Sequence, residues 1–535
     1  MAGDTTLGDS LVDLTVVVHQ LLHQFWGELT QDSIKEWLLA APARYKKWWL
    51  NLMEHSPGHV VVETALILFI IWLVFLRKTE DPAKEETFLS EKEIDQLVKE
   101  WKPEPLVPAP DSSWDEEDED ALVVEEVQGT RVVVKGKSLL NLASFDFLGL
   151  AGRPEVKDAA RAALNKYGCG SCGPRGFYGS IDVHVRAEHA MAKFMGAEEA
   201  ISYSDAASSV SSTLPAFAKK GDLLVVDDGV YEPIQTAIDL SRAQVRWFRH
   251  NDMEDLRRVM EGVRGEDKRL GRNVLEQRRF VVVEGLYKNY GDLCPLPALV
   301  ALKKEFCYRL YLDQTFSFGC FGGGGRGVAE HWGVDLKEVD IMSVSISHAL
   351  GSVGGMCVGT HEVVDHQRLS GAGYCYSASA PPFTSSAAIA ALELLENEPG
   401  LVAKLQNNAI FLCKNLKNIP GLEVRSEEIS PIVHVGLTQE GGREGGWGWR
   451  KEQQEVLREV ARGCVEGGYA VVTSKVTCLV EERGREGGRG GGGGVGLALP
   501  SLRLTVSAAH SQGELQGAVE VIRKVVGSVL KKRKK

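Results

Sequence analysis

The sequence has few features of a metal site or of a fold held together by disulfides. Its 10 cysteines are scattered from Cys169 to Cys478, and Cys169 and Cys172 form a C-x-x-C pair with no second pair nearby. Structural zinc sites usually combine two such closely spaced pairs of ligands. Cysteines scattered through a long chain are typical of free thiols in a reducing compartment. We therefore expect neither a metal ion nor a redox role for the C-x-x-C pair.

The chain also lacks an excess of positive charge. Its 61 Lys and Arg residues stand against 73 Asp and Glu residues, so the formal net charge is -12. Proteins that bind nucleic acids usually present a basic face to the phosphates, so nucleic acid is not expected as a partner. Apolar residues make up 44% and charged residues 25% of the 535 residues. This is an ordinary globular composition, and the length allows a large two-part enzyme fold with extensions.

Long hydrophobic runs are scarce, and the clearest one lies near the N-terminus. Val60–Leu76 reads VVVETALILFIIWLVFL, and Arg77 and Lys78 follow it. At about 1.5 Å of rise per residue, a helix of this length just crosses a hydrocarbon core of about 30 Å. We predict a single transmembrane helix over residues 59–78. A buried core helix is the alternative, because the run is short for a membrane span.

The segments on either side of this run are polar or amphipathic. In residues 1–58, apolar residues recur at helical spacing and tryptophans stand beside basic residues, which suits a membrane interface or a helical hairpin. Residues 79–126 are rich in Pro and Glu and indicate a polar linker. Basic residues flank both ends of the run, so charge does not decide its orientation. The thiol-rich remainder favours a large domain that faces the cytosol.

From residue 127 the pattern changes to that of a large α/β domain, expected over 127–384. Strands are predicted in the stretches EAISYS, DLLVVDD, QVRWFRH, RRFVVVEG, YRLYLDQ, DIMSVSIS and GGMCVG. Helical patterns such as VHVRAEHAMAKFM and MEDLRRVMEGV alternate with them. This alternation predicts a mainly parallel sheet with helices on both faces. Residues 385–535, which begin with a long helical run, are expected to form a smaller α+β domain.

Two glycine-rich stretches interrupt the C-terminal domain, at 440–450 and 482–496. We interpret both as flexible insertions between core elements. A phosphate-binding loop is the alternative for the second stretch, but it lacks the Gly-Lys-Ser/Thr ending. The C-terminal KKRKK is either an endoplasmic reticulum retrieval signal or a solvated basic end that contacts anionic lipid.

One segment of the large domain carries a family motif. The pattern G-T-x-x-x-H-x-x-L-E is matched by Gly179, Ser180, His184 and Glu188. This segment resembles the α-oxoamine synthases, which use pyridoxal phosphate to condense an amino acid with an acyl-CoA. Four further stretches, WKPEPLVP, ASFDFLGL, CGPRGFYG and DHQRLSGAGYCYSASAPPF, resemble the first long-chain-base subunits of serine palmitoyltransferase. The resemblance implies the type I fold of pyridoxal-phosphate-dependent transferases.

The resemblance also points to three changed positions. In catalytic members a lysine a few residues before a Gly-Gly pair holds the cofactor, and counting back from that pair here gives His348. The motif D-E-A-H-S reads DQTFS, which keeps Asp313 but has Phe316 in place of histidine. The histidine that stacks on the cofactor ring is replaced by Tyr231. The resemblance therefore implies no catalytic residue in this chain and a vestigial Asp313 that bonds locally.

Family members are dimers with active sites between subunits, so this chain is expected to complete the site of a similar partner. The candidate interface residues are Cys172, Arg175, Phe177, Tyr178, Val183, Tyr203, Ser377 and Ser379. Of these, Arg175 is expected to pair with a phosphate or carboxylate, and Tyr203 to line the partner's substrate pocket. Interface packing is the alternative role for each residue.

The implied partner is the second, catalytic long-chain-base subunit, which would hold the pyridoxal 5'-phosphate. The implied reaction condenses L-serine with palmitoyl-CoA to 3-ketosphinganine, the first step of sphingolipid synthesis, at the endoplasmic reticulum membrane. Small activating and regulatory membrane subunits would be further partners. Two alternatives stay open: a self-sufficient pyridoxal-phosphate acyltransferase that uses another lysine, and a membrane scaffold or regulatory protein that has kept the fold for binding.

Overall fold

The structure is a computed structural model, and it describes residues 47, 57–72, 90–103, 122–273, 277–438, 447–474 and 498–533. The chain separates into two units, Met1–Asp115 and Glu116–Lys535. The amphipathic helices expected over 1–58 lie almost wholly outside the described residues.

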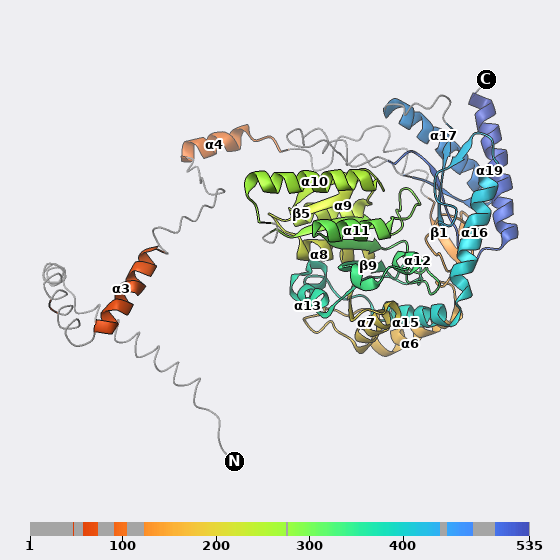
Figure 1. The fold of residues 1–535 in the computed structure, drawn as a ribbon. Coiled ribbons are helices and arrows are strands. Elements are labelled where there is room, and N and C mark those ends of the chain that lie inside the picture. The colour runs from red at the N-terminus through yellow and green to blue at the C-terminus, as the bar shows by residue number, and fades with distance from the viewer. Residues whose placement is uncertain are drawn as a thin grey trace, which may run out of the picture. The chain divides into compact units, whose positions relative to one another are not determined.

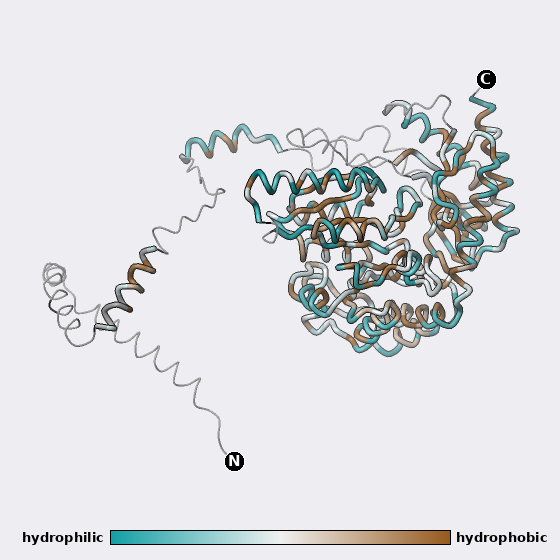
Figure 2. The backbone as a smooth tube through the Cα atoms, in the orientation of Figure 1, coloured by the Kyte–Doolittle hydropathy of each residue, from teal (hydrophilic) through white to brown (hydrophobic). Residues whose placement is uncertain are grey.

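The first unit contains two described helices, α3 (Pro57–Ile71) and α4 (Glu91–Glu100). The apolar residues of α3 show as brown in Figure 2. Among the described residues, no helix is both long and apolar enough to cross a membrane. The helix α3 has 15 residues, and positions 73–78 of the predicted span lie outside the described part. The transmembrane helix therefore stays a prediction.

Helix α4 forms inside the stretch that the composition indicated to be a linker. Ser90 begins it with a capping box, in which the Glu93 carboxylate accepts from the Ser90 amide at 2.8 Å. Ser90-x-x-Glu93 is the sequence signature of such a start. No residue of α4 is buried, which agrees with a polar linker that builds no core of its own.

The second unit is built on a sheet of seven strands in the order β4-β10-β9-β8-β7-β5-β6. The strands are β4 (Glu199–Tyr203), β5 (Leu223–Asp227), β6 (Gln244–Phe248), β7 (Arg279–Glu284), β8 (Arg309–Gln314), β9 (Ile341–Ser345) and β10 (Gly355–Gly359). Each strand lies in a stretch predicted to be one. Strand β10 is antiparallel to both of its neighbours, and the other pairs are parallel, so the sheet is mixed but mainly parallel.

Helices cover both faces of this sheet, and Figure 1 shows α10 and α8 on opposite sides of it. The helices of the large domain are α6 (Pro154–Tyr167), α7 (Asp182–Met195), α8 (Ala206–Phe217), α9 (Glu232–Ser241), α10 (Met253–Leu270), α11 (Leu296–Phe306), α12 (Val328–Trp332), the 3-10 turn Leu336–Glu338, α13 (His361–Ser370), α14 (Ala372–Cys375) and α15 (Pro382–Asn397). Because both faces are covered, all residues of β5, β7 and β9 are buried.

The C-terminal part is an α+β arrangement around a sheet in the order β11-β12-β15-β14. Its elements are α16 (Gly400–Leu416), β11 (Leu422–Val424), β12 (Ile432–Leu437), α17 (Trp447–Glu466), β13 (Tyr469–Ala470), β14 (Val472–Thr473), β15 (Leu502–Thr505) and α19 (Gln512–Arg533). In Figure 1, α16 and α19 run side by side. The long predicted helical run is divided at Pro399, because a proline disfavours helical backbone in the residue before it.

Three features differ from the boundaries expected from the sequence. A third sheet joins β1 (Val124–Gln128), β2 (Arg131–Val134) and β3 (Lys137–Asn141) to β13, so the first strands of the globular part pair with the C-terminal segment. Helix α15 packs on α6 and α7 of the large domain. Helix α17 begins at Trp447, inside the first glycine-rich stretch. The rest of that insertion and the whole of the second lie outside the described residues.

A half-buried histidine connects the carboxyl ends of neighbouring strands. His250, which follows β6, lies with Nδ1 2.8 Å from Asp227 at the end of β5 and with Nε2 3.0 Å from Asp292 in the loop after β7. Its ring stacks on Tyr290 with centroids 3.9 Å apart. Burial lowers the pKa of His250, but the two carboxylates outweigh it and raise that pKa to about 10. A charged imidazolium therefore holds the 285–295 loop at the edge of the sheet.

This geometry predicts a pH-dependent contribution to stability. The pKa of His250 is raised in the folded chain, so its contribution is complete below about pH 6.5 and is lost as the pH rises through about 10. We expect His250→Gln to lower the free energy of unfolding at pH 7, on the order of 1.4 kcal/mol per unit of pKa shift. Urea denaturation of both proteins in detergent checks this. The difference between them should nearly vanish at pH 10.5, and an unchanged difference would contradict the imidazolium.

Candidate functional site

A buried pair of carboxylates lies where β7 and β8 end. Glu284 and Asp313 are directly opposite each other on these parallel strands, and both side chains are buried. The Tyr231 hydroxyl donates to Asp313 Oδ2 at 3.0 Å, and the Thr315 amide donates to Oδ1 at 2.7 Å. Burial raises the pKa of Asp313 to about 6. The carboxylate thus forms local hydrogen bonds, and its vestigial character stays a prediction.

Aromatic rings fill the space in front of this carboxylate. Phe316 stacks on His348 with ring centroids 4.8 Å apart and an interplanar angle of 10°. Phe145 lies edge-on to both rings at 5.1 Å, and Tyr231 lies edge-on to Phe316 at 5.5 Å. The structure therefore brings the three changed positions, 231, 316 and 348, into one cluster. Phe145, from the stretch ASFDFLGL, completes the cluster, and the sequence pattern did not single it out.

The residues of this cluster do not fit a pyridoxal-phosphate site. Such a site needs an amine for the covalent bond, a carboxylate that is free to meet the ring nitrogen and room for the ring. Here position 348 carries an imidazole, whose pKa is lowered to about 4 by burial and then by the charges of Lys288 and Arg503. The Asp313 carboxylate is already bound by Tyr231, and Phe316 stacks on His348. The chain's own side chains therefore bond or pack against the groups that a cofactor would need.

The predicted interface residues divide into exposed and buried groups. Cys172, Phe177 and Tyr178 lie on an exposed loop; Phe177 is 68% exposed and Tyr178 is fully exposed. Cys172 and Tyr178 both have left-handed backbone, with φ of 57° and 65°. Ser377 and Ser379 are half-buried. The Ser379 hydroxyl donates to the carbonyl oxygens of Gly173 and Gly179, so a second segment, residues 376–380, is bonded to the exposed loop.

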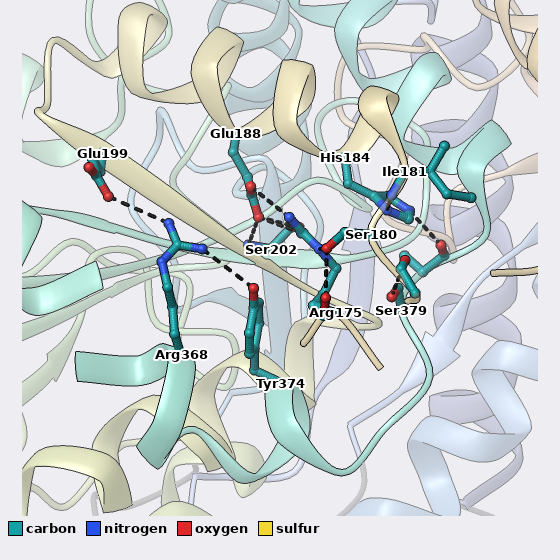
Figure 3. Close-up of polar contacts among 12 residues, drawn as sticks. Arg175, Ser180, Ile181, His184, Glu188, Glu199, Ser202, Arg368, Tyr374 and Ser379 are labelled. Atoms are coloured by element: carbon teal, nitrogen blue, oxygen red, sulfur yellow. Dashed lines mark hydrogen bonds and ion pairs between the residues drawn. The ribbon is translucent and has the colours of Figure 1, made fainter. Parts of the chain in front are cut away.

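Three of the predicted interface residues lie inside the chain instead. Arg175 is 7% exposed and forms a two-pronged ion pair with Glu188 (Figure 3), so its guanidinium is not free for a partner's phosphate or carboxylate. Val183 is fully buried in α7, and Tyr203 is buried in β4 with its hydroxyl donating to Gln367 at 2.8 Å. Arg175 thus pairs with a carboxylate, as expected, but with one of its own chain. The contribution of these three residues to a partner's site stays a prediction.

Comparisons with known proteins identify the family of this chain. The family model "Aminotransferase class I and II" matches residues 137–522. Long chain base biosynthesis protein 1b of Oryza sativa subsp. japonica is 39% identical over 89% of this chain and 93% of its own. Long chain base biosynthesis protein 1 of Arabidopsis thaliana is 39% identical over 90% and 97%, and serine palmitoyltransferase 1 of Dictyostelium discoideum is 35% identical over 90% and 98%. This chain belongs to their family.

Solved structures agree with this family assignment. The serine palmitoyltransferase of Sphingomonas wittichii superposes with a TM-score of 0.67 at 26% identity, covering 80% of this chain and 99% of its own. A serine palmitoyltransferase structure described as holding a pyridoxal phosphate internal aldimine gives 0.66 at 27% identity, covering 82% and 98%. The fold is that of the pyridoxal-phosphate-dependent aminotransferases, and the resemblance read from the sequence motifs is confirmed.

The closed site predicts that restoring the lysine does not restore cofactor binding. We expect His348→Lys to place an ammonium among Phe145, Phe316 and the charges of Lys288 and Arg503. It should lower the free energy of unfolding by about 2–3 kcal/mol. His348→Phe keeps the ring stack and should cost less than about 1.5 kcal/mol. Urea denaturation and the absorption of the chain purified with added pyridoxal phosphate check both, and a cofactor band in His348→Lys would contradict the closed site.

Proposed function

We propose that this chain is the non-catalytic but required subunit of a heterodimeric serine palmitoyltransferase. The proposal rests on two features that occur together in this fold. The family scaffold is intact, whereas Tyr231, Phe316 and His348 close the place where a relative holds its cofactor. A chain that keeps the fold without the site retains its surfaces, and the fold's dimer interface is the surface that reaches a neighbouring site.

The proposed partner supplies what this chain lacks. In the heterodimer the second long-chain-base subunit holds pyridoxal 5'-phosphate and the lysine, and it condenses L-serine with palmitoyl-CoA to 3-ketosphinganine with release of CO2 and CoA. This chain stabilises the partner and completes its active site from across the interface. Its exposed Cys172, Phe177, Tyr178 and Tyr376, in segments tied by Ser379, support this role. Exposed aromatic rings of this kind are typical of protein interfaces.

A self-sufficient enzyme finds less support in the structure. Lys304, one of the lysines nearest in sequence, pairs with Glu338 on the surface. Lys288 lies closer to the aromatic cluster, 6.0 Å from the centroid of the Tyr231 ring, but its Nζ is 2.9 Å from the Glu232 carboxylate. A lysine held as a charged ion-pair partner is a poor nucleophile.

The heterodimer predicts that neither chain is active alone. We expect serine-dependent long-chain-base formation when this chain is co-expressed with the catalytic subunit in cells that lack both endogenous subunits. The partner alone and this chain alone should each fall to background, because one lacks half of its interface and the other lacks the cofactor site. Product from this chain alone would establish the self-sufficient alternative. Full activity of the partner alone would reduce this chain to a scaffold.

The same proposal includes attachment to the endoplasmic reticulum membrane by one helix, with the large domain in the cytosol and small activating and regulatory subunits as further membrane partners. Apolar side chains of α3 that a bilayer could cover support it: Leu66, Leu68, Phe69 and Ile70 are each more than half exposed in this unit. An acyl-CoA substrate and a lipid-like product are compatible with a reaction at a membrane.

Charges in α3 should release the chain from membranes. A lysine at the centre of a membrane helix raises the free energy of insertion by about 2.5–3.5 kcal/mol, and Leu68→Lys/Phe69→Lys introduces two of them. We expect the unchanged chain to stay in the pellet after alkaline carbonate extraction and Leu68→Lys/Phe69→Lys to move to the supernatant. Leu97→Lys/Val98→Lys in α4 is the matched control and should stay in the pellet. Release of the unchanged chain would contradict the anchor.

A further inference from the structure

The exposed loop of residues 170–180 has a conformation that its sequence does not favour by itself. Cys172 and Tyr178 both adopt left-handed backbone, which costs a residue with a side chain about 1–2 kcal/mol. Between them, the amides of Phe177 and Gly179 both donate to the carbonyl oxygen of Pro174, at 3.0 and 2.9 Å. The tip that carries the exposed Phe177 and Tyr178 rings is therefore a tight turn, and something outside the turn must hold it.

Arg175 provides that hold from inside the protein. Its NH1 and NH2 groups donate to the two carboxylate oxygens of Glu188 on α7, at 2.6 and 2.9 Å. NH1 also donates to the Ser202 hydroxyl on β4 at 2.6 Å, and Nε donates to the Ser180 hydroxyl at 3.0 Å. All three guanidinium nitrogens are thus bonded. Burial alone lowers the pKa of Arg175, and the bonds to Glu188 outweigh it so that the pKa is raised.

The base of the loop is packed too closely to adopt another shape. The Ser180 hydroxyl returns a hydrogen bond to the Arg175 carbonyl at 2.7 Å. A side chain at Gly179 would begin 1.8 Å from the Gly173 carbonyl oxygen, so two backbone segments touch here. Arg175 therefore fixes the segments on either side of the turn to α7 and to β4.

The second exposed segment is bonded to the same unit. The Ser379 amide donates to the Gly173 carbonyl at 2.9 Å, and the Ser171 hydroxyl donates to the Ser379 carbonyl at 2.8 Å. The Tyr374 ring lies 5.6 Å from the Arg175 guanidinium carbon, and Arg368 connects Tyr374 to Glu199 (Figure 3). A shift of Arg175 would therefore move residues 376–380 along with residues 170–180.

We propose that the Arg175–Glu188 ion pair is a positioning element for the partner's reaction. Both residues are buried, so neither touches substrate. They hold the Phe177–Tyr178 turn and the 376–380 segment in one fixed arrangement toward the partner's active site. This inference rests on the proposed function and adds to it the residues that set the loop. A buried two-pronged pair needs the planar fork of arginine, which a lysine cannot reproduce.

The chain offers a matched control in a second buried ion pair. Arg279 and Asp267 join β7 to α10 through bonds of 2.7 and 2.9 Å, with side chains as buried as those of the first pair. These elements carry neither exposed segment. Arg279→Lys should therefore cost stability much as Arg175→Lys does, without altering the loops.

The test compares heterodimers of the full chain and its catalytic partner that carry Arg175→Lys, Glu188→Gln or Arg279→Lys. We expect all three to co-purify with the partner. Arg175→Lys and Glu188→Gln should raise the KM for L-serine or for palmitoyl-CoA by about three- to tenfold, whereas Arg279→Lys should leave both KM values unchanged. Equal KM values in all three, with a similar loss of thermal stability, would reduce the pair to a structural role and overturn the proposal.

Two further measurements keep the test decisive. If Arg175→Lys or Glu188→Gln does not assemble, Ser202→Ala leaves the ion pair in place. It removes only the two hydrogen bonds of the Ser202 hydroxyl, from Arg175 and to Glu188, and should still raise a KM. Unchanged KM values in Ser202→Ala would overturn the proposal. Hydrogen exchange needs no activity: the Phe177 and Gly179 amides should lose protection in Arg175→Lys and keep it in Arg279→Lys, and unchanged protection would also overturn the proposal. The proposed function and this inference can also fail separately. If the exchange differences are as expected but the heterodimer without substitutions shows no activity, the proposed function is wrong and the role of Arg175 in holding the loop stands.

Discussion

The character of this chain depends on the hydrogen bond from the Tyr231 hydroxyl to the Asp313 carboxylate. Asp313 is buried at the end of a central strand, and a buried carboxylate must be met by hydrogen-bond donors. In a pyridoxal-phosphate enzyme the cofactor ring meets that need. Here a tyrosine and the Thr315 amide meet it, and the tyrosine ring packs edge-on against Phe316. Tyr231 therefore takes part in both the polar and the aromatic contacts of this cluster.

The second distinctive region of the chain lies at its surface. The exposed Phe177 and Tyr178 rings stand on a turn whose support is buried, because the Arg175 fork bonds to α7 and β4 beneath it. The two regions differ in the interactions that hold them. Around His348 aromatic rings pack against one another, whereas around Arg175 a buried charged network holds an exposed loop in place.

Much of the fold could be read from local patterns, and its long-range pairings could not. The seven strands of the main sheet follow short apolar stretches, because strands covered on both faces read as continuous apolar runs. The antiparallel direction of β10 and the pairing of β3 with β13 depend on how distant segments meet. Helix α4 carried a capping signal at Ser90, but the surrounding proline and glutamate residues indicated a linker.

The sequence by itself determined which side chains stand at positions 231, 316 and 348, because the identity of a residue is covalent and does not depend on packing. It also identified the family, since several long motifs occur in order. Tertiary structure alone decided the direction of each side chain. The side chains of Arg175 and Val183, in the family motif, and of Tyr203, in a predicted strand, are all buried. Their burial and hydrogen bonding depend on how α7, β4 and α13 pack together, which the spacing of residues does not describe.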